Sequence, residues 1–153
     1  MSRVVLTYGT FDLFHYGHLR LLERCKGLGD RLVVGVSTDE FNSEKGKKTI
    51  IPFSHRIELV RSIKHVDACF EETSWNQKEE DIQTLNVDLL VMGADWIGKF
   101  DHLQDLCDVE YLSRTANISS SDIKYALNFT LLDELTRISS AVESMKTIVA
   151  ALR

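Results

Sequence analysis

The fold is decided by residues 4–18, which read Val-Val-Leu-Thr-Tyr-Gly-Thr-Phe-Asp-Leu-Phe-His-Tyr-Gly-His. The apolar run at the start of this stretch predicts a strand that ends at about Tyr8. Helically spaced apolar residues from Leu19 to Cys25 predict a helix that begins near Gly17. The sequence therefore predicts a strand, a polar loop and a helix N-terminus in immediate succession.

His15 and His18 lie at the start of that predicted helix. A helix N-terminus presents unpaired N–H groups and a partial positive charge, both of which suit phosphate. Because the two histidines are three residues apart, both can face the same spot as the helix begins. Such a pair can also bind zinc, but no cysteine, glutamate or third histidine supports a zinc site here. We interpret the stretch as a nucleotide-handling active site.

Strand-like and helical patterns continue to alternate through the chain. Apolar runs predict strands at Val4–Tyr8, Arg31–Ser37, Val66–Phe70, Val87–Met92 and Val109–Leu112. Helical patterns lie near residues 18–27, 54–64, 77–86 and 99–107. The first, second and fourth runs are continuously apolar, which is typical of strands buried on both sides. The predicted fold class is α/β, an open parallel sheet of about five strands with helices on both faces.

Length and composition fit an ordinary globular domain. The chain has 153 residues, a formal net charge of −5 and 44% hydrophobic residues. An acidic chain lacks the basic stripe of a nucleic-acid surface, and no apolar run reaches the length of a membrane span. The three cysteines fit neither a disulfide framework nor a zinc pattern. We therefore expect a cytoplasmic protein with reduced, half-buried cysteines that binds neither nucleic acid nor membrane.

Polar segments follow two later strands, at the carboxyl ends where an open parallel sheet gathers its ligands. Gly93-Ala-Asp-Trp96 follows the fourth apolar run, and Arg114-Thr-Ala-Asn-Ile-Ser-Ser-Ser121 follows the last one. Helix capping alone would explain the serine run, and Asp95 would serve as a turn former. Arg114 is harder to explain in this way, because a guanidinium beside a helix N-terminus strengthens the positive potential that a phosphate meets.

Residues 43–52, Ser-Glu-Lys-Gly-Lys-Lys-Thr-Ile-Ile-Pro, form a basic loop that contains a glycine. Charge runs are usually solvated, and the sequence by itself favours a solvated turn here. The alternative interpretation is that Lys45 and Lys47 reach an anionic substrate from a mobile loop.

Residues 128–153 contain neither glycine nor proline and predict a long helix after a break around Asn128. Its apolar residues, spaced alternately by four and three positions, form a heptad seam of Leu131, Leu135, Ile138, Val142, Met145, Val149 and Leu152. The seam either packs on the chain's own domain or joins subunits, and we favour a homo-oligomer. The predicted organisation is a domain of residues 1–127 followed by a C-terminal helical extension of residues 128–153.

Two of these motifs resemble those of a known family. Gly9-Thr-Phe-Asp-Leu-Phe-His-Tyr-Gly-His18 is similar to the GTFDxxHxGH signature of the cytidylyltransferase-like nucleotidyltransferases, and residues 114–121 resemble their RTxGISTT signature. The likeness is greatest to the glycerol-3-phosphate cytidylyltransferase group and runs from residue 3 to about residue 127. It implies a Rossmann-like fold and transfer of CMP from CTP to a small phosphorylated alcohol for surface polysaccharide synthesis. No covalent enzyme intermediate is implied, so catalysis would depend on positioning and charge stabilisation.

The resemblance also implies roles for individual residues. The catalytic set would be His15, His18, Arg114 and Lys45. The nucleotide would be bound by Thr10, Phe11, His15, His18, Lys47, Asp95, Arg114, Thr115, Ile118, Ser119, Ser120 and Ser121. The acceptor would be bound by Asp12, Lys45, Arg56 and Lys78. A Mg²⁺ ion would be held mainly by CTP and water, and no metal ligand is assigned to the protein.

A few positions depart from the glycerol-3-phosphate group. Ala116-Asn117 replaces the usual Glu-Gly, Ala94 stands where a second acid is usual, and Lys64 replaces an arginine. Asn tolerates a positive φ, so the Asn117 loop can still form a phosphate nest. The acceptor therefore stays open between glycerol 3-phosphate and another polyol or sugar phosphate. Two alternatives are an ATP-dependent adenylyltransferase acting on a heptose phosphate or FMN, and a non-catalytic nucleotide-binding module.

Overall fold

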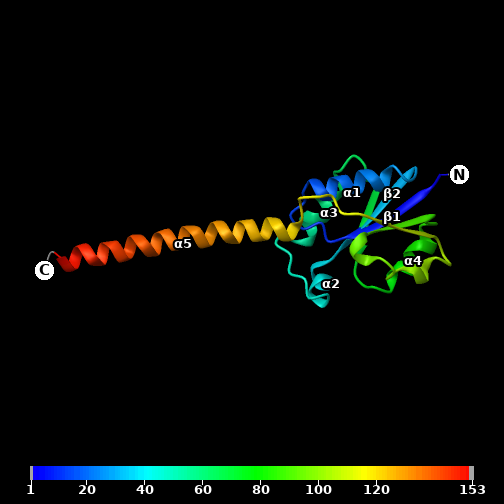
Figure 1. Cartoon of the computed structure of the whole chain (residues 1–153). Coiled ribbons are helices and arrows are strands. Elements are labelled where there is room, and N and C mark those ends of the chain that lie inside the picture. Colours follow the sequence, from blue (N-terminus) through cyan, green and yellow to red (C-terminus); the bar gives the residue numbers. More distant parts are fainter. Residues whose placement is uncertain (1, 152–153) are drawn as a thin grey trace. The chain divides into compact units, whose positions relative to one another are not determined.

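A five-stranded parallel sheet organises the first part of the chain (Figure 1). The computed structural model describes residues 2–151, and the side chains of all of these except 129, 130 and 151. The strands are β1 (Val4–Gly9), β2 (Arg31–Ser37), β3 (Ala68–Glu72), β4 (Leu89–Gly93) and β5 (Asp108–Leu112). They lie in the order β3-β2-β1-β4-β5, and all neighbouring pairs are parallel. The order reverses between β1 and β4, and open α/β sheets bind ligands at the carboxyl ends of the strands at such a point.

Helices cover both faces of this sheet (Figure 1). They are α1 (Tyr16–Lys26), α2 (Asp39–Glu44), α3 (Phe53–Arg61) and α4 (Gln77–Thr84). α1 and α3 pack on one face, where Leu22, Cys25 and Val60 belong to one apolar core. α4 packs on the opposite face through Ile82, which belongs to the second core. The predicted α/β class, with five parallel strands and helices on both faces, is confirmed.

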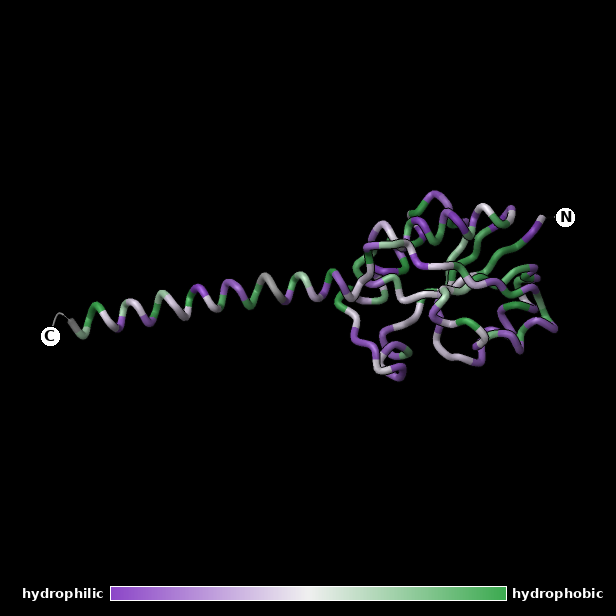
Figure 2. The backbone as a smooth tube through the Cα atoms, in the orientation of Figure 1, coloured by the Kyte–Doolittle hydropathy of each residue, from purple (hydrophilic) through white to green (hydrophobic). Residues whose placement is uncertain are grey.

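β1 contributes to both cores because successive side chains of a strand point to opposite faces. Val4, Leu6 and Tyr8 join the core beneath α4, and Val5 joins the core beneath α1 and α3. In Figure 2 the backbone of the strands is coloured mainly as hydrophobic. A strand buried on both sides needs apolar residues at successive positions, which explains the continuous apolar run in the sequence.

Gly35 makes room for two aromatic rings in this sheet. It is the register partner of Tyr8 on β1 and of Phe70 on β3. The rings of Tyr8 and Phe70 meet edge to face with their centroids 6.0 Å apart. A Cβ atom on Gly35 would lie 2.3 Å from the Tyr8 ring. The missing side chain at Gly35 therefore allows the Tyr8 ring to lie across β2.

Two short helical elements differ from the prediction. α2 was not predicted, although Thr38 provides its N-cap by accepting a hydrogen bond from the Phe41 N–H at 3.2 Å. Residues 99–107 do not form the predicted α-helix but the 3₁₀ turn η2 (Asp101–Leu103). Phe100, Leu103 and Cys107 nevertheless belong to one core, so their helical spacing marks burial without an α-helix.

The predictions for β3 and for the cysteines have different outcomes. β3 begins at Ala68, two residues later than predicted, because Val66 still belongs to the turn after α3 and donates its N–H to Ile63 O at 2.9 Å.

Cys25 and Cys107 are buried, Cys69 is half-buried, and all three are free thiols. The expected half-burial therefore holds for Cys69, whereas Cys25 and Cys107 lie deeper in the two cores.

The chain divides into two compact units, Met1–Ile118 and Ser119–Arg153, and the second consists mainly of α5 (Ser120–Ala151). Ser119 caps this helix, because its Oγ accepts a hydrogen bond from the Asp122 N–H at 3.1 Å. The helix runs without interruption through Asn128, so the predicted break there is wrong. Leu152, the last predicted seam residue, lies outside the described residues. Between residues 2 and 151, no helix has both the length and the apolar character needed to span a membrane.

Candidate active site

His15 and His18 cap the first turn of α1 reciprocally. His15 is the N-cap, and its Nδ1 accepts the N–H of Gly17 at 3.0 Å. Three residues on, the Nδ1 of His18 accepts the backbone N–H of His15 at 3.2 Å. The two rings stack with centroids 3.9 Å apart. This is the geometry of a capping box, built from imidazoles where a hydroxyl and a carboxylate are usual.

The capping bonds determine which ring nitrogen carries the proton. Because Nδ1 accepts in both His15 and His18, the neutral form of each ring is protonated at Nε2. Burial, and to a smaller degree the neighbouring His15, lower the pKa of His18 to about 4, although Asp12 opposes the shift. His18 is therefore a neutral N–H donor at pH 7, which suits contact with a phosphate oxygen.

The loop between β1 and α1 has an unusual backbone. Phe11 and Leu13 have φ values of 53° and 50°, in the left-handed region that residues other than glycine seldom adopt. The ring of Phe11 folds back over Gly9, where a Cβ atom would lie 2.8 Å from it. Phe11 is 3% exposed and packs edge to face on His18 with centroids 5.5 Å apart. Conformations of this kind cluster at functional sites, where packing holds the strain.

Asp12 anchors the basic loop against this stretch. It is buried, and its two carboxylate oxygens accept the N–H groups of Ile50 and Ile51, each at 2.9 Å. Thr10 makes a second cross-connection, donating its hydroxyl to Asn42 Oδ1 at 3.0 Å. Asp12 therefore caps the basic loop, and its predicted contact with substrate stays a prediction.

Arg56 is completely buried and joins four segments of the chain. Its Nε donates to Ile51 O at 2.9 Å, and its Nη1 donates to Thr10 O and Ser37 O at 2.6 and 2.8 Å. Its Nη2 donates to Asp39 Oδ1 at 2.7 Å. The guanidinium therefore ties the loop after β1 to the end of β2 and to the end of the basic loop.

Lys45 is not the solvated residue that a surface turn would provide. Its side chain is 9% exposed, and its Nζ donates to Ser37 Oγ at 2.9 Å. It lies 4.2 Å from the centroid of the Phe41 ring and 3.9 Å from Glu72 Oε2. Burial, opposed by Glu72 and assisted by nearby cations, lowers the pKa of Lys45 to about 8. The solvated-turn interpretation is therefore wrong for Lys45.

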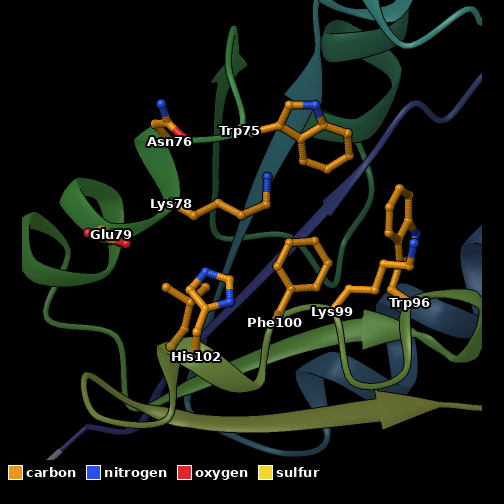
Figure 3. A pocket seen from close by; sticks show the side chains of 9 residues that line it. Trp75, Asn76, Lys78, Glu79, Trp96, Lys99, Phe100 and His102 are labelled. Carbon is orange, nitrogen blue, oxygen red and sulfur yellow. The ribbon is translucent and has the colours of Figure 1, made fainter.

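Lys78 reaches the same place from α4. It forms an ion pair with Glu72, and both side chains are 3% exposed. A cavity of about 370 Å³ opens beside Lys78, and Figure 3 shows Trp75, Trp96 and Phe100 around it. Lys47 approaches from the basic loop, with its Nζ 5.6 Å from the centroid of the Trp96 ring.

Asp95 and Arg114, from the loops after β4 and β5, form an exposed ion pair in which Nε donates to Oδ2 at 2.9 Å. Asn117 has a φ of 63°, so the expectation that it adopts a positive φ is confirmed.

Ile118 lies against the start of α1, with its Cγ2 3.2 Å from where a Cβ on Gly17 would be. The first unit thus holds both signatures up to Ile118. Thr115 is half-buried there, and Ser119, Ser120 and Ser121 open the second unit.

Sequence reasoning missed three residues of this site. Ser37, Asp39 and Glu72 all lie at or just after the carboxyl ends of β2 and β3. The rule that ligands gather at such ends would have found Glu72. It was missed because the predicted strand ended at Phe70, two residues too early.

Comparison with known proteins decides the family. Residues 6–126 match the family described as "Cytidylyltransferase-like". The chain belongs to the cytidylyltransferase-like family. The match covers most of the first unit and ends within α5, so most of that helix lies outside the family's common domain.

Individual relatives of this cytidylyltransferase-like chain carry a more specific name. It is 54% identical over 120 residues to the glycerol-3-phosphate cytidylyltransferase of Bacillus subtilis (strain 168), covering 78% of this chain and 93% of that protein. It is 50% identical over 127 residues to the glycerol-3-phosphate cytidylyltransferase of Staphylococcus aureus (strain NCTC 8325 / PS 47), covering 83% and 96%. A solved structure of the lipopolysaccharide core biosynthesis protein from Thermoplasma volcanium GSS1 is similar with a TM-score of 0.64 at 25% identity. That likeness covers 75% of this chain and 99% of that one.

Proposed function

We propose that this protein transfers CMP from CTP to glycerol 3-phosphate, giving CDP-glycerol and pyrophosphate. The observation that carries the proposal is the 54% identity to a named glycerol-3-phosphate cytidylyltransferase over 93% of that enzyme's length. Residues 94, 116 and 117 depart from the pattern of the glycerol-3-phosphate group, but the chain otherwise keeps both signatures of the family. The product would feed a reaction that consumes an activated polyol phosphate, such as surface polysaccharide synthesis.

The histidine pair would stabilise the α-phosphate during the transfer. Their capped Nδ1 atoms leave Nε2–H as the donor on each neutral ring, and hydrogen bonds from these groups to the α-phosphate oxygens that carry the developing charge lower the barrier. The acceptor oxygen attacks the α-phosphorus of CTP, and the bond to the bridging oxygen of pyrophosphate breaks. Because the acceptor is already a phosphate anion, no residue has to remove a proton from the nucleophile.

Three cations of the predicted site would neutralise the reacting phosphates. Lys45 and Lys47 approach from the basic loop, and Arg114 carries a guanidinium that can make two parallel hydrogen bonds to a phosphate. Arg114 is paired with Asp95 and exposed, so it can exchange this carboxylate for phosphate at modest cost. Thr10, Phe11, Thr115, Ile118 and the serines 119–121 would complete the nucleotide site as the family resemblance implies.

Mg²⁺ would enter with the nucleotide. The carboxylate of Asp12 is occupied by two backbone N–H groups, and that of Asp95 by Arg114. Within residues 2–151, no three histidine, cysteine, aspartate or glutamate side chains are grouped to hold a metal. These residues fit an ion bound mainly by triphosphate oxygens and water, which neutralises charge on the leaving pyrophosphate.

Pyrophosphate release tests the reaction directly. The purified protein is given CTP or ATP together with glycerol 3-phosphate, a sugar phosphate or FMN. We expect release only with CTP and glycerol 3-phosphate, and CDP-glycerol as the second product. Release with ATP in place of CTP would indicate an adenylyltransferase, and no release with any pair would indicate a nucleotide-binding module.

His15→Asn separates chemistry from folding. Asparagine is among the best N-cap residues, so the variant keeps the cap of α1 but loses the Nε2–H donor. We expect turnover to fall by at least about 10²-fold with an unchanged melting temperature, as is typical when one transition-state donor is removed. His55→Asn, at an exposed position of α3, is the matched control and should change neither. Full turnover in His15→Asn would remove this imidazole from the mechanism.

We also propose that α5 joins two copies of this chain. Its described seam residues Leu131, Leu135, Ile138, Val142, Met145 and Val149 are 46–65% exposed. Leu132 and Ile148, which flank the seam, are exposed as well. These eight side chains each offer on the order of 100 Å² of apolar surface, which approaches the roughly 800 Å² per partner of a stable interface.

A second copy fits this seam better than a membrane surface does. Spacings of four and three over successive heptads match the seam of another helix, and Asn128 falls on the same seam, where a polar residue can set register. Two ion pairs form along α5, Asp133 with Arg137 and Glu143 with Lys146. A helix that lies on a membrane usually has a polar face rich in lysine and arginine, which is missing here.

Light scattering tests this association. Ile138→Glu places a charge within the seam, whereas Ser140→Glu places the same charge on the opposite side of the helix. We expect the first variant to halve the mass and the second to leave it unchanged. A wild-type mass of one chain, or an equal mass for both variants, would contradict self-association through α5.

A further inference from the structure

The ammonium group of Lys78 lies inside a cage of three aromatic rings. Its Nζ is 4.3 Å from the centroid of the Tyr8 ring, 5.1 Å from that of Trp75 and 5.5 Å from that of Phe100. Figure 3 shows the Lys78 side chain directed between Trp75 and Phe100. The rings come from three different segments, β1, the loop before α4 and the turn before η2.

A buried carboxylate completes this cage. Glu72 pairs with Lys78 through Oε1 and accepts the Ser37 hydroxyl on Oε2 at 2.5 Å. The Nζ of Lys45 lies 3.9 Å from the same Oε2. Aromatic faces around one carboxylate attract alkylammonium ions, because the rings contribute cation–π attraction and the carboxylate supplies the counter-charge. The cage therefore has the composition of an alkylammonium site, and the protein's own lysine fills it.

The cavity beside the cage is where an acceptor alcohol would approach. It measures about 370 Å³, and Lys78, Trp75 and Phe100 belong both to its wall and to the cage. Lys45, which we assign to the reacting phosphates, adjoins the cage, with its Nζ 3.9 Å from Glu72 Oε2 and 5.5 Å from the centroid of the Trp75 ring. A phosphorylated alcohol held at Lys45 would thus direct its carbon chain toward the cage.

We infer that Lys78 is a tethered cation that closes an alkylammonium site and so makes the enzyme select an uncharged polyol phosphate over an aminoalcohol phosphate. An acceptor that carries its own ammonium finds the aromatic faces and Glu72 already occupied, and meets a like charge. A polyol phosphate carries no ammonium to be repelled, and its hydroxyls need only polar contacts in the outer cavity. This inference rests on the proposed function for its substrate class, but the cage itself can be tested without turnover.

Rescue of Lys78→Ala by an added amine is the first test. Propylammonium replaces the atoms that the substitution removes, Cγ, Cδ, Cε and Nζ. We expect a lowered melting temperature in Lys78→Ala because Glu72 loses its partner, and a rise with increasing propylammonium at constant ionic strength. Propanol and sodium should give no such rise, and wild type should not respond. If the variant does not fold alone, propylammonium-dependent folding followed by circular dichroism is the same readout.

The double variant Lys78→Ala/Glu72→Gln is the matched control for charge. It removes the carboxylate, so propylammonium should no longer stabilise the protein. A rise in melting temperature with propylammonium in Lys78→Ala, but not in the double variant, supports the cage. Equal responses of the two variants, or no response in either, would overturn the assignment of a cation site.

Acceptor selectivity is the second test. In Lys78→Gln, which removes the charge but keeps a hydrogen-bond donor, the ratio of kcat/KM for ethanolamine phosphate to that for glycerol 3-phosphate should rise about tenfold or more, as expected for a desolvated cation–π site. An unchanged ratio with an equally raised KM for both acceptors would instead assign Lys78 to the acceptor phosphate and overturn the inference. If wild type turns over no acceptor, the proposed function fails, and the amine rescue still decides whether the cage binds cations.

Discussion

Replacing Arg56 by methionine tests whether this guanidinium holds the active-site loops in place. Methionine keeps much of the volume and the apolar stem of the side chain but removes every donor. Arg56 donates four hydrogen bonds, to the carbonyls of Thr10, Ser37 and Ile51 and to Asp39. We therefore expect Arg56→Met to destabilise the fold and to displace the loop that carries the lysines.

The magnitude follows from what loses its partner. A hydrogen bond from a charged donor contributes about 1.5–3 kcal/mol, but such contributions are not additive within one network. Ser37 O keeps a second donor, Asn42 Nδ2, at 3.3 Å, and Asp39 keeps the Phe53 N–H at 2.9 Å. The carbonyls of Thr10 and Ile51 lose the Arg56 donor, and an acceptor left unsatisfied costs about 1–3 kcal/mol, so the loss should lie near about 4 kcal/mol. For a chain of this length, that lowers the melting temperature by about 8–16 °C.

Urea unfolding of Arg56→Met, with Arg61→Met as control, measures this loss. Arg61 lies on the same helix and is exposed, so its replacement should change the free energy of unfolding by less than about 0.5 kcal/mol. The catalytic efficiency of Arg56→Met should also fall at temperatures where it is folded. Unchanged stability together with a raised KM for the acceptor would refute this reasoning and make Arg56 a substrate ligand, as the family resemblance implies.

The other predictions concern packing and protonation. Gly35→Ala would bring a Cβ within 2.3 Å of the Tyr8 ring, so the free energy of unfolding measured in urea should fall by about 1–3 kcal/mol. Gly27→Ala is the control, because its Cβ would lie 3.4 Å from the nearest atom and the free energy of unfolding should not change measurably. Burial lowers the pKa of His18 to about 4, so the unfolded chain binds more protons and stability should rise by roughly 3 kcal/mol from pH 4 to 6.5. His18→Gln should remove that rise, and an undiminished rise would assign it to other groups. Burial lowers the pKa of Lys45 to about 8, so much of this amine is neutral at pH 8.5 and should take up protons when the CTP anion binds. Calorimetry in buffers of different ionisation enthalpy measures the number of protons taken up, and an uptake of zero would contradict the prediction.

The part of the fold that sequence predicts well is the part fixed by burial on two sides. Continuous apolar runs located β1, β2 and β4, because a strand covered on both faces has no position for a polar side chain. β3 was placed too early because its flanking residues Val66 and Asp67 are a turn residue and an exposed anchor. Residues 99–107 were predicted as helix since burial of Phe100, Leu103 and Cys107 repeats with a helical period. Periodicity reports which residues are buried, and it cannot distinguish an α-helix from successive turns that bury the same residues.

Some residues of the candidate site can likewise be predicted from local sequence, and others cannot. A strand followed by His15 and His18 at a helix start predicts an anion site from local geometry alone, and the structure brings those histidines together. The burial of Arg56 and Lys78 could not be predicted from the sequence, because a charged residue is expected at the surface and nothing in the neighbouring sequence indicates burial. Their burial depends on partners far along the chain, Thr10 for Arg56 and Tyr8 for Lys78.

The polar residues of this site serve two different needs. The amides of residues 50 and 51 and the carbonyls of residues 10 and 51 belong to loops, so no strand or helix partner satisfies them. Asp12 and Arg56 supply the missing hydrogen bonds, and any substrate chemistry performed on these loops requires them equally. Lys78 instead pairs with a side chain, Glu72, and packs against the Tyr8 ring, so in our proposal its arrangement follows the acceptor and not the loop backbone. A change of acceptor should therefore be sought at the cage and its cavity, whereas substitutions at Asp12 and Arg56 should impair every acceptor alike.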